Sequence, residues 1–335
     1  MKRQLKKYLL LGVVACALPA LSFGIGGKKT CVYADRNGVI KQVDSITSIP
    51  REYQSSAQCF DANQNSFMAD PKEVSLKGNV REEYISSSVG RISLRWPRTA
   101  ETLFGRTPVR AMADAASTVS RVLKGAGFTP ELQRLSLEWN VVFMDENVPV
   151  TQIPAYLVSN CHPAWMTPPA NLYIVAQRVV AGCSGSRGGH TNSVNDAQLS
   201  QVLIHEMGHA VEYALLKGKG GGDRMRAEGF ASWFEQYGSD FSSVNTKGAA
   251  RQYYSDLAKQ AFAQSPDRFT FQGSAHDYAR ASMFFHAIVN KRGVRGLMDV
   301  YDGIINDNLD FFSAIDSKMG WNAATLNAES MRALK

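Results

Sequence analysis

The run His205-Glu206-Met207-Gly208-His209 constrains the fold of this 335-residue chain more than any other feature. Residues four positions apart on an α-helix lie one above the other, so the two imidazoles project from one face. Two imidazoles placed in this way can bind a single metal ion. Glu206 lies between them, toward the side where a water molecule on that ion would sit, which is the place of a general base. The motif therefore predicts a helix that carries a metal site together with a base.

The residues around the motif predict where this helix begins and ends. Asn195 or Asp196 can cap its N-terminus, and Lys217-Gly218 provides a basic last turn and a stop. The helix should therefore reach about residue 216. The Gly-rich run that follows is predicted to be a loop, and a second helix is expected over residues 224 to 237.

The second helix supplies candidates for a third metal ligand. A catalytic zinc ion has three protein ligands and one position left for water. Glu228 lies on the helix that returns past the motif and is the natural third ligand, with Glu235 as the rival one helical face away. We interpret Glu235 instead as the hydrogen-bond acceptor of a ligand His. The sequence thus predicts one Zn²⁺ ion bound by His205, His209 and Glu228.

The residues around Glu228 resemble those of the gluzincin metallopeptidases. Eighteen residues separate His209 from Glu228, as in that group. The string Glu228-Gly229-Phe230-Ala231 is similar to one that follows the zinc motif in the aminopeptidase-N-like family, although Ala227 replaces the Asn that precedes it there. The resemblance covers roughly residues 105 to 330 in layout and indicates the broad peptidase MA-like group.

The resemblance implies a zinc peptidase, in which Glu206 is the general base for a metal-activated water that attacks a peptide bond. Residues 276 to 289 look like the helix that carries the transition-state Tyr of that family. That helix ends in a Gly there, as this one would at Gly293. Tyr278 is then the candidate donor of a hydrogen bond to the oxyanion. The alternatives for this role are His276 and His286.

Two departures from the family bear on activity. The Gly-x-Met-Glu-Asn string that holds the free amino terminus of a substrate in aminopeptidase-N-like enzymes is absent, which favours an endopeptidase. Ser232 stands where thermolysin-like enzymes have an Asp that orients a ligand His, which leaves Glu235 or Glu212 for that task. The alternatives to an endopeptidase are a cell-wall peptide hydrolase of the same fold and a non-catalytic envelope binding protein.

The first residues predict export. Residues 1 to 7 are basic, residues 8 to 18 are apolar and residues 19 to 22 are small, which indicates a signal peptide over residues 1 to 22. Its apolar run is too short for a stable anchor, so no membrane span is expected after cleavage. A lipoprotein processing site at Cys16 is the alternative. The mature protein is therefore expected in the periplasm or secreted.

Four cysteines remain after this cleavage: Cys31, Cys59, Cys161 and Cys183. An even number of cysteines in an exported protein predicts two disulfides. Sequence proximity favours Cys31–Cys59 and Cys161–Cys183 among three possible connectivities.

The net charge bears on the partner. The whole sequence has a formal charge of +7, and its first 22 residues contain four basic residues and no acid, which leaves +3. This charge is too small and too dispersed for a nucleic-acid-binding protein. The expected partner is a peptide or protein substrate, and the sequence makes no prediction of oligomeric state.

The chain as a whole predicts an α+β fold. Residues 23 to 60 are expected to form a small disulfide-closed β-hairpin module with a turn at residues 35 to 38, residues 61 to 80 a linker, and residues 81 to 335 a zincin-like catalytic domain. In that domain a small sheet lies beside the zinc-binding helices, and the C-terminal part is helical. Strands are expected at residues 91 to 96, 135 to 144 and 172 to 180, and helices at residues 108 to 124 and over residues 294 to 335.

An edge strand of this sheet would bind extended substrate. Residues 171 to 179 are the candidate edge, although their apolar content fits a buried central strand equally well. Residues 160 to 169, rich in Pro, are expected to form a loop that rims the cleft.

Overall fold

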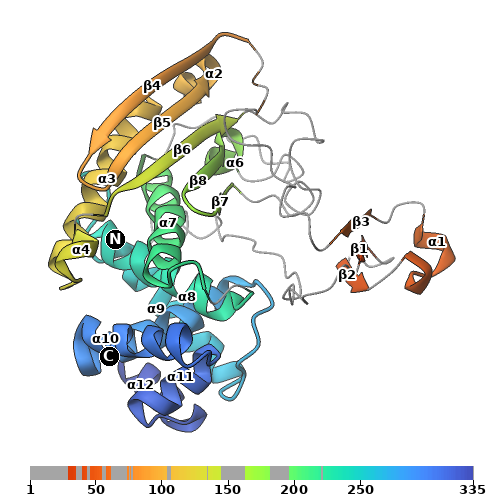
Figure 1. Cartoon of the computed structure of the whole chain (residues 1–335), viewed down its shortest axis with the longest axis vertical. Helices are drawn as coiled ribbons and strands as arrows, with labels where there is room; N and C mark the ends of the chain where they lie inside the picture. Colours follow the sequence, from red (N-terminus) through yellow and green to blue (C-terminus); the bar gives the residue numbers. More distant parts are fainter. Residues whose placement is uncertain are drawn as a thin grey trace, which may run out of the picture.

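The structure is a computed structural model. It describes residues 29–34, 40–43, 46–54, 58–61, 74, 76, 78–103, 107–133, 135–144, 163–181, 196–219 and 222–334. From residue 78 onward, a mixed β-sheet lies against α3 and α7, and the C-terminal helices α10 to α12 lie at the opposite end (Figure 1). This arrangement agrees with the predicted α+β class.

The sheet of the larger part has five strands in the order β4-β5-β6-β8-β7. These are β4 (Val80–Ser87), β5 (Gly90–Pro97), β6 (Leu137–Met144), β7 (Ala164–Thr167) and β8 (Asn171–Val175). The pairs β4–β5 and β7–β8 are antiparallel, whereas β5–β6 and β6–β8 are parallel. The three predicted strands are present, and β4 and β7 join them.

Two predictions about β8 are wrong. The predicted strand over residues 172 to 180 ends at Val175, and the short helix α6 (Ala176–Ala181) takes its second half. The candidate edge position is also wrong: β8 lies between β6 and β7, which is the buried central position that its apolar content fitted equally well. The edges of the described sheet are β4 and β7, and β7 forms within the stretch that was predicted to be a loop.

The long helices that the sequence predicted are present, and others that it did not predict, among them the helix over residues 249–264, join them. The short ones are α1 (Arg51–Gln54), α2 (Arg98–Leu103) and α4 (Pro130–Gln133). The long ones are α3 (Pro108–Gly125), α7 (Asp196–Leu215), α8 (Arg224–Ser239), α9 (Ala249–Gln264), α10 (Ala275–Asn306), α11 (Phe311–Met319) and α12 (Ala323–Arg332). Gly293 interrupts α10 with φ 64° and ψ −170°, a conformation that favours glycine. The helix predicted from residue 276 therefore ends at Gly293, as expected, and a second helical segment continues from there to Asn306.

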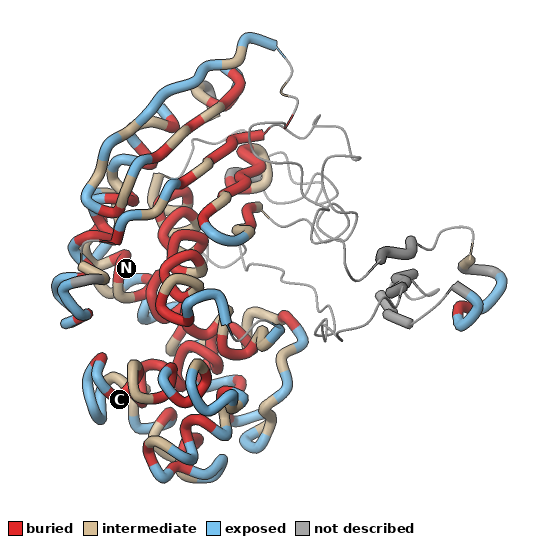
Figure 2. Tube along the Cα trace, in the orientation of Figure 1, coloured by how far each residue is buried: buried red, intermediate tan, exposed pale blue. Residues whose placement is uncertain are grey.

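Both faces of the central strands are buried. Successive side chains of a strand point to opposite faces, so Val141 and Phe143 of β6 pack toward the helices while Val142 and Met144 pack on the other side. The helix-side core continues through α7 and α8, where Figure 2 shows buried segments at the centre of the larger part. Val74, inside the predicted linker, is buried on the opposite face.

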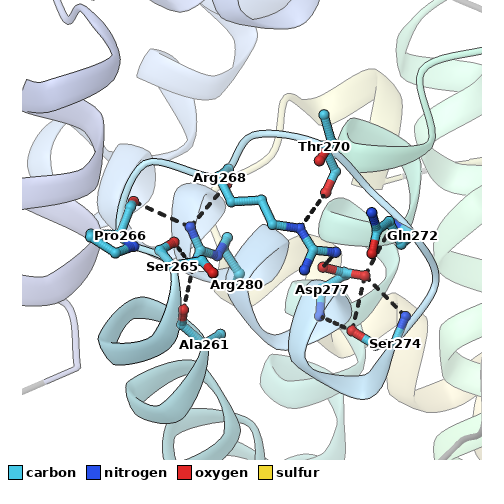
Figure 3. Close-up of polar contacts among 9 residues, drawn as sticks. All are labelled: Ala261, Ser265, Pro266, Arg268, Thr270, Gln272, Ser274, Asp277 and Arg280. Carbon is cyan, nitrogen blue, oxygen red and sulfur yellow. Dashed lines mark hydrogen bonds and ion pairs between the residues drawn. The ribbon is translucent and has the colours of Figure 1, made fainter.

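The segment between α9 and α10 is held by a buried arginine (Figure 3). Arg280 is 2% exposed and donates to backbone carbonyl oxygens of the preceding segment. The acceptors are Pro266 at 3.2 Å, Arg268 at 2.9 Å, Ala261 and Ser265. One side chain thereby binds four carbonyl groups in the last turn of α9 and the residues that follow it.

Asp277 fixes the other end of this segment (Figure 3). It pairs with Arg268 at 2.8 Å and accepts hydrogen bonds from the backbone N–H groups of Gln272 and Ser274, both at 3.0 Å. With the Ser274 side chain it also forms a capping box at the start of α10. The α9–α10 segment is therefore fixed at both ends.

The N-terminal module is larger than the predicted hairpin. Strands β1 (Lys29–Ala34) and β2 (Ile40–Val43) form the expected hairpin, and β3 (Gln58–Asp61) pairs with the other side of β1. A short 3₁₀ helix covers Ile46–Ser48. The backbone register places Cys31 opposite Cys59, so their disulfide stays a prediction with a fitting register. The predicted signal peptide, Cys16, Cys161 and Cys183 lie outside the described residues.

Within the described ranges, no helix is long and apolar enough to cross a membrane.

Candidate metal centre

Two neighbouring helices bring the three predicted ligands together. His205 and His209 lie one turn apart on α7, and Glu228 lies in the second turn of α8, which packs against α7. The Glu228 Oε2 atom is 3.4 Å from the Nε2 atom of each histidine. One ligand atom from each of the three residues lies within 4.8 Å of the others. The side chains thus converge on one point.

The chemistry of this donor set fits zinc. Zinc in proteins is bound by imidazole nitrogen and carboxylate oxygen, and catalytic sites use three such ligands. Two donors about 2.0–2.1 Å from one tetrahedral zinc ion lie about 3.3 Å apart. The observed separation of 3.4 Å between Glu228 Oε2 and each Nε2 matches that value. The carboxylate oxygen and each histidine nitrogen are therefore already spaced as two ligands of one zinc ion would be.

The charges around the ligands also favour a cation at this point. Burial lowers the pKa of His205, but its hydrogen bonds to Glu228 and Glu235 outweigh that effect and raise the pKa to about 10. Burial acts to raise the pKa of Glu228, but the two histidines hold it well below its usual range. The site therefore stabilises positive charge where the ligand atoms meet, and a metal ion would supply it.

Glu235 contacts the second nitrogen of a ligand. Its Oε2 atom lies 3.1 Å from Nδ1 of His205 and accepts a hydrogen bond from the Tyr254 hydroxyl at 2.8 Å. This position fits the role predicted for Glu235, since a carboxylate on Nδ1 directs Nε2 toward the metal. Tyr254 comes from α9, and no pattern near the motif could have indicated it.

Glu212, the other candidate for that role, has different partners. It lies on α7 but pairs with Arg226 at 3.0 Å and accepts a hydrogen bond from the Tyr301 hydroxyl at 2.8 Å. All three side chains are buried. Of the two acids that the sequence left open, the geometry therefore favours Glu235 beside His205.

Glu206 has the environment of a general base. The residue is 8% exposed and belongs to the same helix as the two histidines. Burial raises the pKa of Glu206, while the histidines act in the opposite direction. A carboxylate with a raised pKa takes up a proton near neutral pH more readily than an exposed one.

Tyr278 lies beside the ligands, in the first turn of α10. Its ring is 6.2 Å from the His205 ring and 5.1 Å from the Phe271 ring, measured between centroids. Burial raises the pKa of Tyr278 well above its usual range, and the nearby Glu228 carboxylate adds to this. The hydroxyl therefore keeps its proton and can donate it in a hydrogen bond.

The two alternatives to Tyr278 have partners elsewhere. Nε2 of His276 lies 3.2 Å from Oε1 of Gln260 on α9. Nε2 of His286 lies 3.0 Å from Oε1 of Gln236 on α8, in the buried core. The geometry therefore favours Tyr278 among the three candidates.

We expect the buried His286 to make the fold less stable in acid. Burial lowers the pKa of His286 to about 3, and Arg251 adds to the shift. Because the unfolded chain binds a proton below about pH 6.5 and the folded chain does not, stability is full above that pH and falls between pH 6.5 and 3. At pH 5, His286 should lower the free energy of unfolding by about 2 kcal/mol relative to neutral pH. Urea unfolding at pH 7.5 and pH 5 should show a smaller loss for His286→Gln than for the wild type. Equal losses would contradict a neutral His286 in the fold.

A cavity of about 230 Å³ adjoins the ligands. His209 and Arg224 line its metal side, and Met166 and Pro168 line it from the end of β7. The Pro-rich stretch around residue 165 therefore lies at the cleft, as expected. The strand beside the cleft is β7, which contacts α7 and forms an edge of the described sheet.

Comparisons with known proteins give matches among solved structures alone. No protein-family model and no curated protein matches the chain. An M1 zinc metallopeptidase from Deinococcus radiodurans is similar at 12% identity and a TM-score of 0.39, over 76% of this chain and 51% of that chain. A mutant of an M1 zinc metallopeptidase from the same organism has 10% identity and a TM-score of 0.41, over 91% and 61%. An aminopeptidase N family protein from Idiomarina loihiensis has 12% identity and a TM-score of 0.42, over 72% and 44%. The chain thus spans roughly half the length of these structures.

Proposed function

We propose that this chain is an exported zinc metallopeptidase that hydrolyses peptide bonds within protein or peptide substrates. One observation carries the proposal: His205, His209 and Glu228 converge within 4.8 Å, with Glu206 on the same helix as the histidines. This is the donor set of a catalytic zinc site, with a base next to the position that water would take.

The residues of the site divide the chemistry among them. When bound, zinc would polarise the substrate carbonyl and lower the pKa of a water molecule toward neutrality. Glu206 takes a proton from the attacking water and returns it to the leaving amine. Tyr278 donates a hydrogen bond to the carbonyl oxygen, which becomes an oxyanion as water adds to the carbonyl carbon. Glu235 keeps His205 in the tautomer and orientation that present Nε2.

Cleavage within a chain is favoured over removal of a terminal residue. The sequence lacks the Gly-x-Met-Glu-Asn string that would hold a free amino terminus. The edge strand β7 lies beside the cleft and can pair with the backbone of an extended peptide. Backbone pairing is largely independent of side chains, so such a site would accept varied sequences.

The test combines zinc content with three kinds of substrate. Full-length protein should contain one zinc ion per chain and should cleave unfolded casein. It should also cleave internal bonds of peptides whether or not their amino terminus is acetylated. Cleavage of free-amino peptides alone would replace the endopeptidase by an aminopeptidase, and cleavage of purified peptidoglycan alone would identify a cell-wall hydrolase. Absence of zinc binding would overturn the proposal and favour a binding protein.

A further inference from the structure

The two oxygens of the Glu228 carboxylate have different partners. Oε2 faces both histidines, at 3.4 Å from each Nε2 atom. Oε1 instead accepts a hydrogen bond from Nη2 of Arg224 at 3.1 Å. One oxygen of the carboxylate therefore points to the place where the ligands meet, and the other is held by a cation.

We propose that Arg224 is a positioning residue of the metal centre, which holds Oε1 of Glu228 so that Oε2 alone is presented to the metal ion. This inference rests on the proposed zinc site. Arg224 is the first residue of α8, and Glu228 follows four residues later, so both side chains lie on one face of the helix. A guanidinium has fixed N–H directions and can therefore fix the orientation of a carboxylate better than a flexible ammonium can.

Phe271 provides a platform for this arginine. The guanidinium carbon of Arg224 lies 5.0 Å from the centroid of the Phe271 ring, within the range of a cation–π contact. The opposite neighbour of Phe271 is Tyr278, whose ring meets it edge-on at 5.1 Å. Arg224 also interacts directly with the Tyr278 hydroxyl, so it is linked to the candidate oxyanion donor both directly and through the Phe271 ring.

The segment that carries Phe271 is itself fixed. It joins α9 to α10, and Figure 3 shows the contacts of Arg280 and Asp277 that hold its two ends. A rigid segment keeps Phe271 in place, and Phe271 limits the rotamers open to Arg224. Arg224 therefore loses its side-chain entropy when the chain folds, and metal binding causes no further loss.

Two opposite effects decide what loss of Arg224 would do. A cation that merely lies near a zinc ion repels it, so removing the cation would tighten zinc binding. A residue that orients a ligand improves binding, and loss of such an outer partner typically weakens metal affinity about 10–100-fold. The sign of the change therefore separates a positioning role from simple proximity.

The experiment measures zinc affinity of the full chain by competition with a chromophoric chelator. Arg224→Met should bind zinc about tenfold more weakly or worse. Arg224→Lys should recover part of the affinity, because its ammonium can still donate to Oε1. The matched control is Lys219→Met, because Lys219 is a nearby cation that donates to the carbonyl oxygen of Ile305 at 2.8 Å. This control should keep wild-type affinity or bind slightly more tightly.

Zinc binding as tight in Arg224→Met as in the wild type, or tighter, would overturn the inference. Equal weakening in Arg224→Met and Lys219→Met would overturn it too, since the weakening would then not depend on contact with Glu228. Unfolding of the metal-free proteins by urea shows whether each variant folds. If Arg224→Met does not fold, Arg224→Lys and Phe271→Leu decide, and both should weaken zinc binding. A wild type that binds no zinc would instead refute the proposed function itself.

Discussion

Replacing Glu206 with Gln is expected to abolish peptide hydrolysis while zinc binding and the fold stay as in the wild type. Glu206 is buried on the helix that carries both histidines, and burial raises its pKa. The amide of Gln has nearly the same shape but cannot take a proton from the attacking water. General base catalysis contributes about 10²–10⁴-fold, so the rate of casein cleavage should fall by at least that range.

The matched control for this variant is Glu212→Gln, a second buried acid on the same helix. Glu212 pairs with Arg226 and Tyr301, so its loss should reduce stability by about 2 kcal/mol. Turnover per zinc-loaded molecule should remain. Glu206→Gln is thus expected to lose casein cleavage and keep its stability in urea, whereas Glu212→Gln should lose stability and keep casein cleavage. Wild-type activity of Glu206→Gln on an unfolded protein would rule out its role as the base.

Local helix geometry explains why part of the site could be predicted from the sequence. The spacing of His205 and His209 places both rings on one face of any helix that contains them, whatever surrounds it. Glu228 required one more assumption, a helix that returns past the first, and the stop after residue 216 and the start at residue 224 supplied it. The positions of all three ligands could therefore be predicted from patterns that are local in the sequence.

The remaining contacts of the site depend on segments that are distant in sequence. Tyr254 reaches Glu235 from α9, and Phe271 reaches Arg224 from the segment after α9. Neither contact leaves a periodic pattern, because each depends on how α9 packs against α8. The i,i+4 spacing of Arg224 and Glu228 was visible in the sequence, but such pairs usually lie on solvated surfaces.

Burial explains which strands the sequence revealed. The strand β5 alternates buried and partly exposed residues and was predicted, whereas most of β4 is exposed and has no apolar period. β7 has four residues in a Pro-rich stretch. The apolar run from residue 172 continued past the end of β8 because α6 is partly buried as well. Periodicity alone does not separate a buried strand from a buried helix.

Replacing Gly229 with Val is expected to weaken both the fold and zinc binding. A Cβ atom at this position would lie 2.9 Å from the carbonyl oxygen of Ala281 and 2.9 Å from a ring carbon of Phe285, both on α10. Because one of these atoms belongs to the backbone, α8 and α10 would have to separate. Overpacking typically lowers the free energy of unfolding by about 1–3 kcal/mol, and the bulk of Val should bring the loss for this variant to about 3 kcal/mol. Glu228 and Tyr278 belong to the two helices, so urea unfolding and chelator competition should both show the effect.

Gly208→Ala tests whether close packing, and not proximity to the ligands, is the cause. Gly208 lies directly before His209, yet its Cβ would meet the Cα of Ala231 at 3.3 Å and Phe234 at 3.4 Å, which small shifts can accommodate. Alanine also gains about 0.5–1 kcal/mol over glycine inside a helix, so this variant should be nearly neutral. A more damaging effect of Gly208→Ala than of Gly229→Val would contradict the explanation. If the order holds, the string from Glu228 to Phe230 has a physical meaning: a ligand, a residue without a side chain where two helices meet, and a core aromatic that is fully buried.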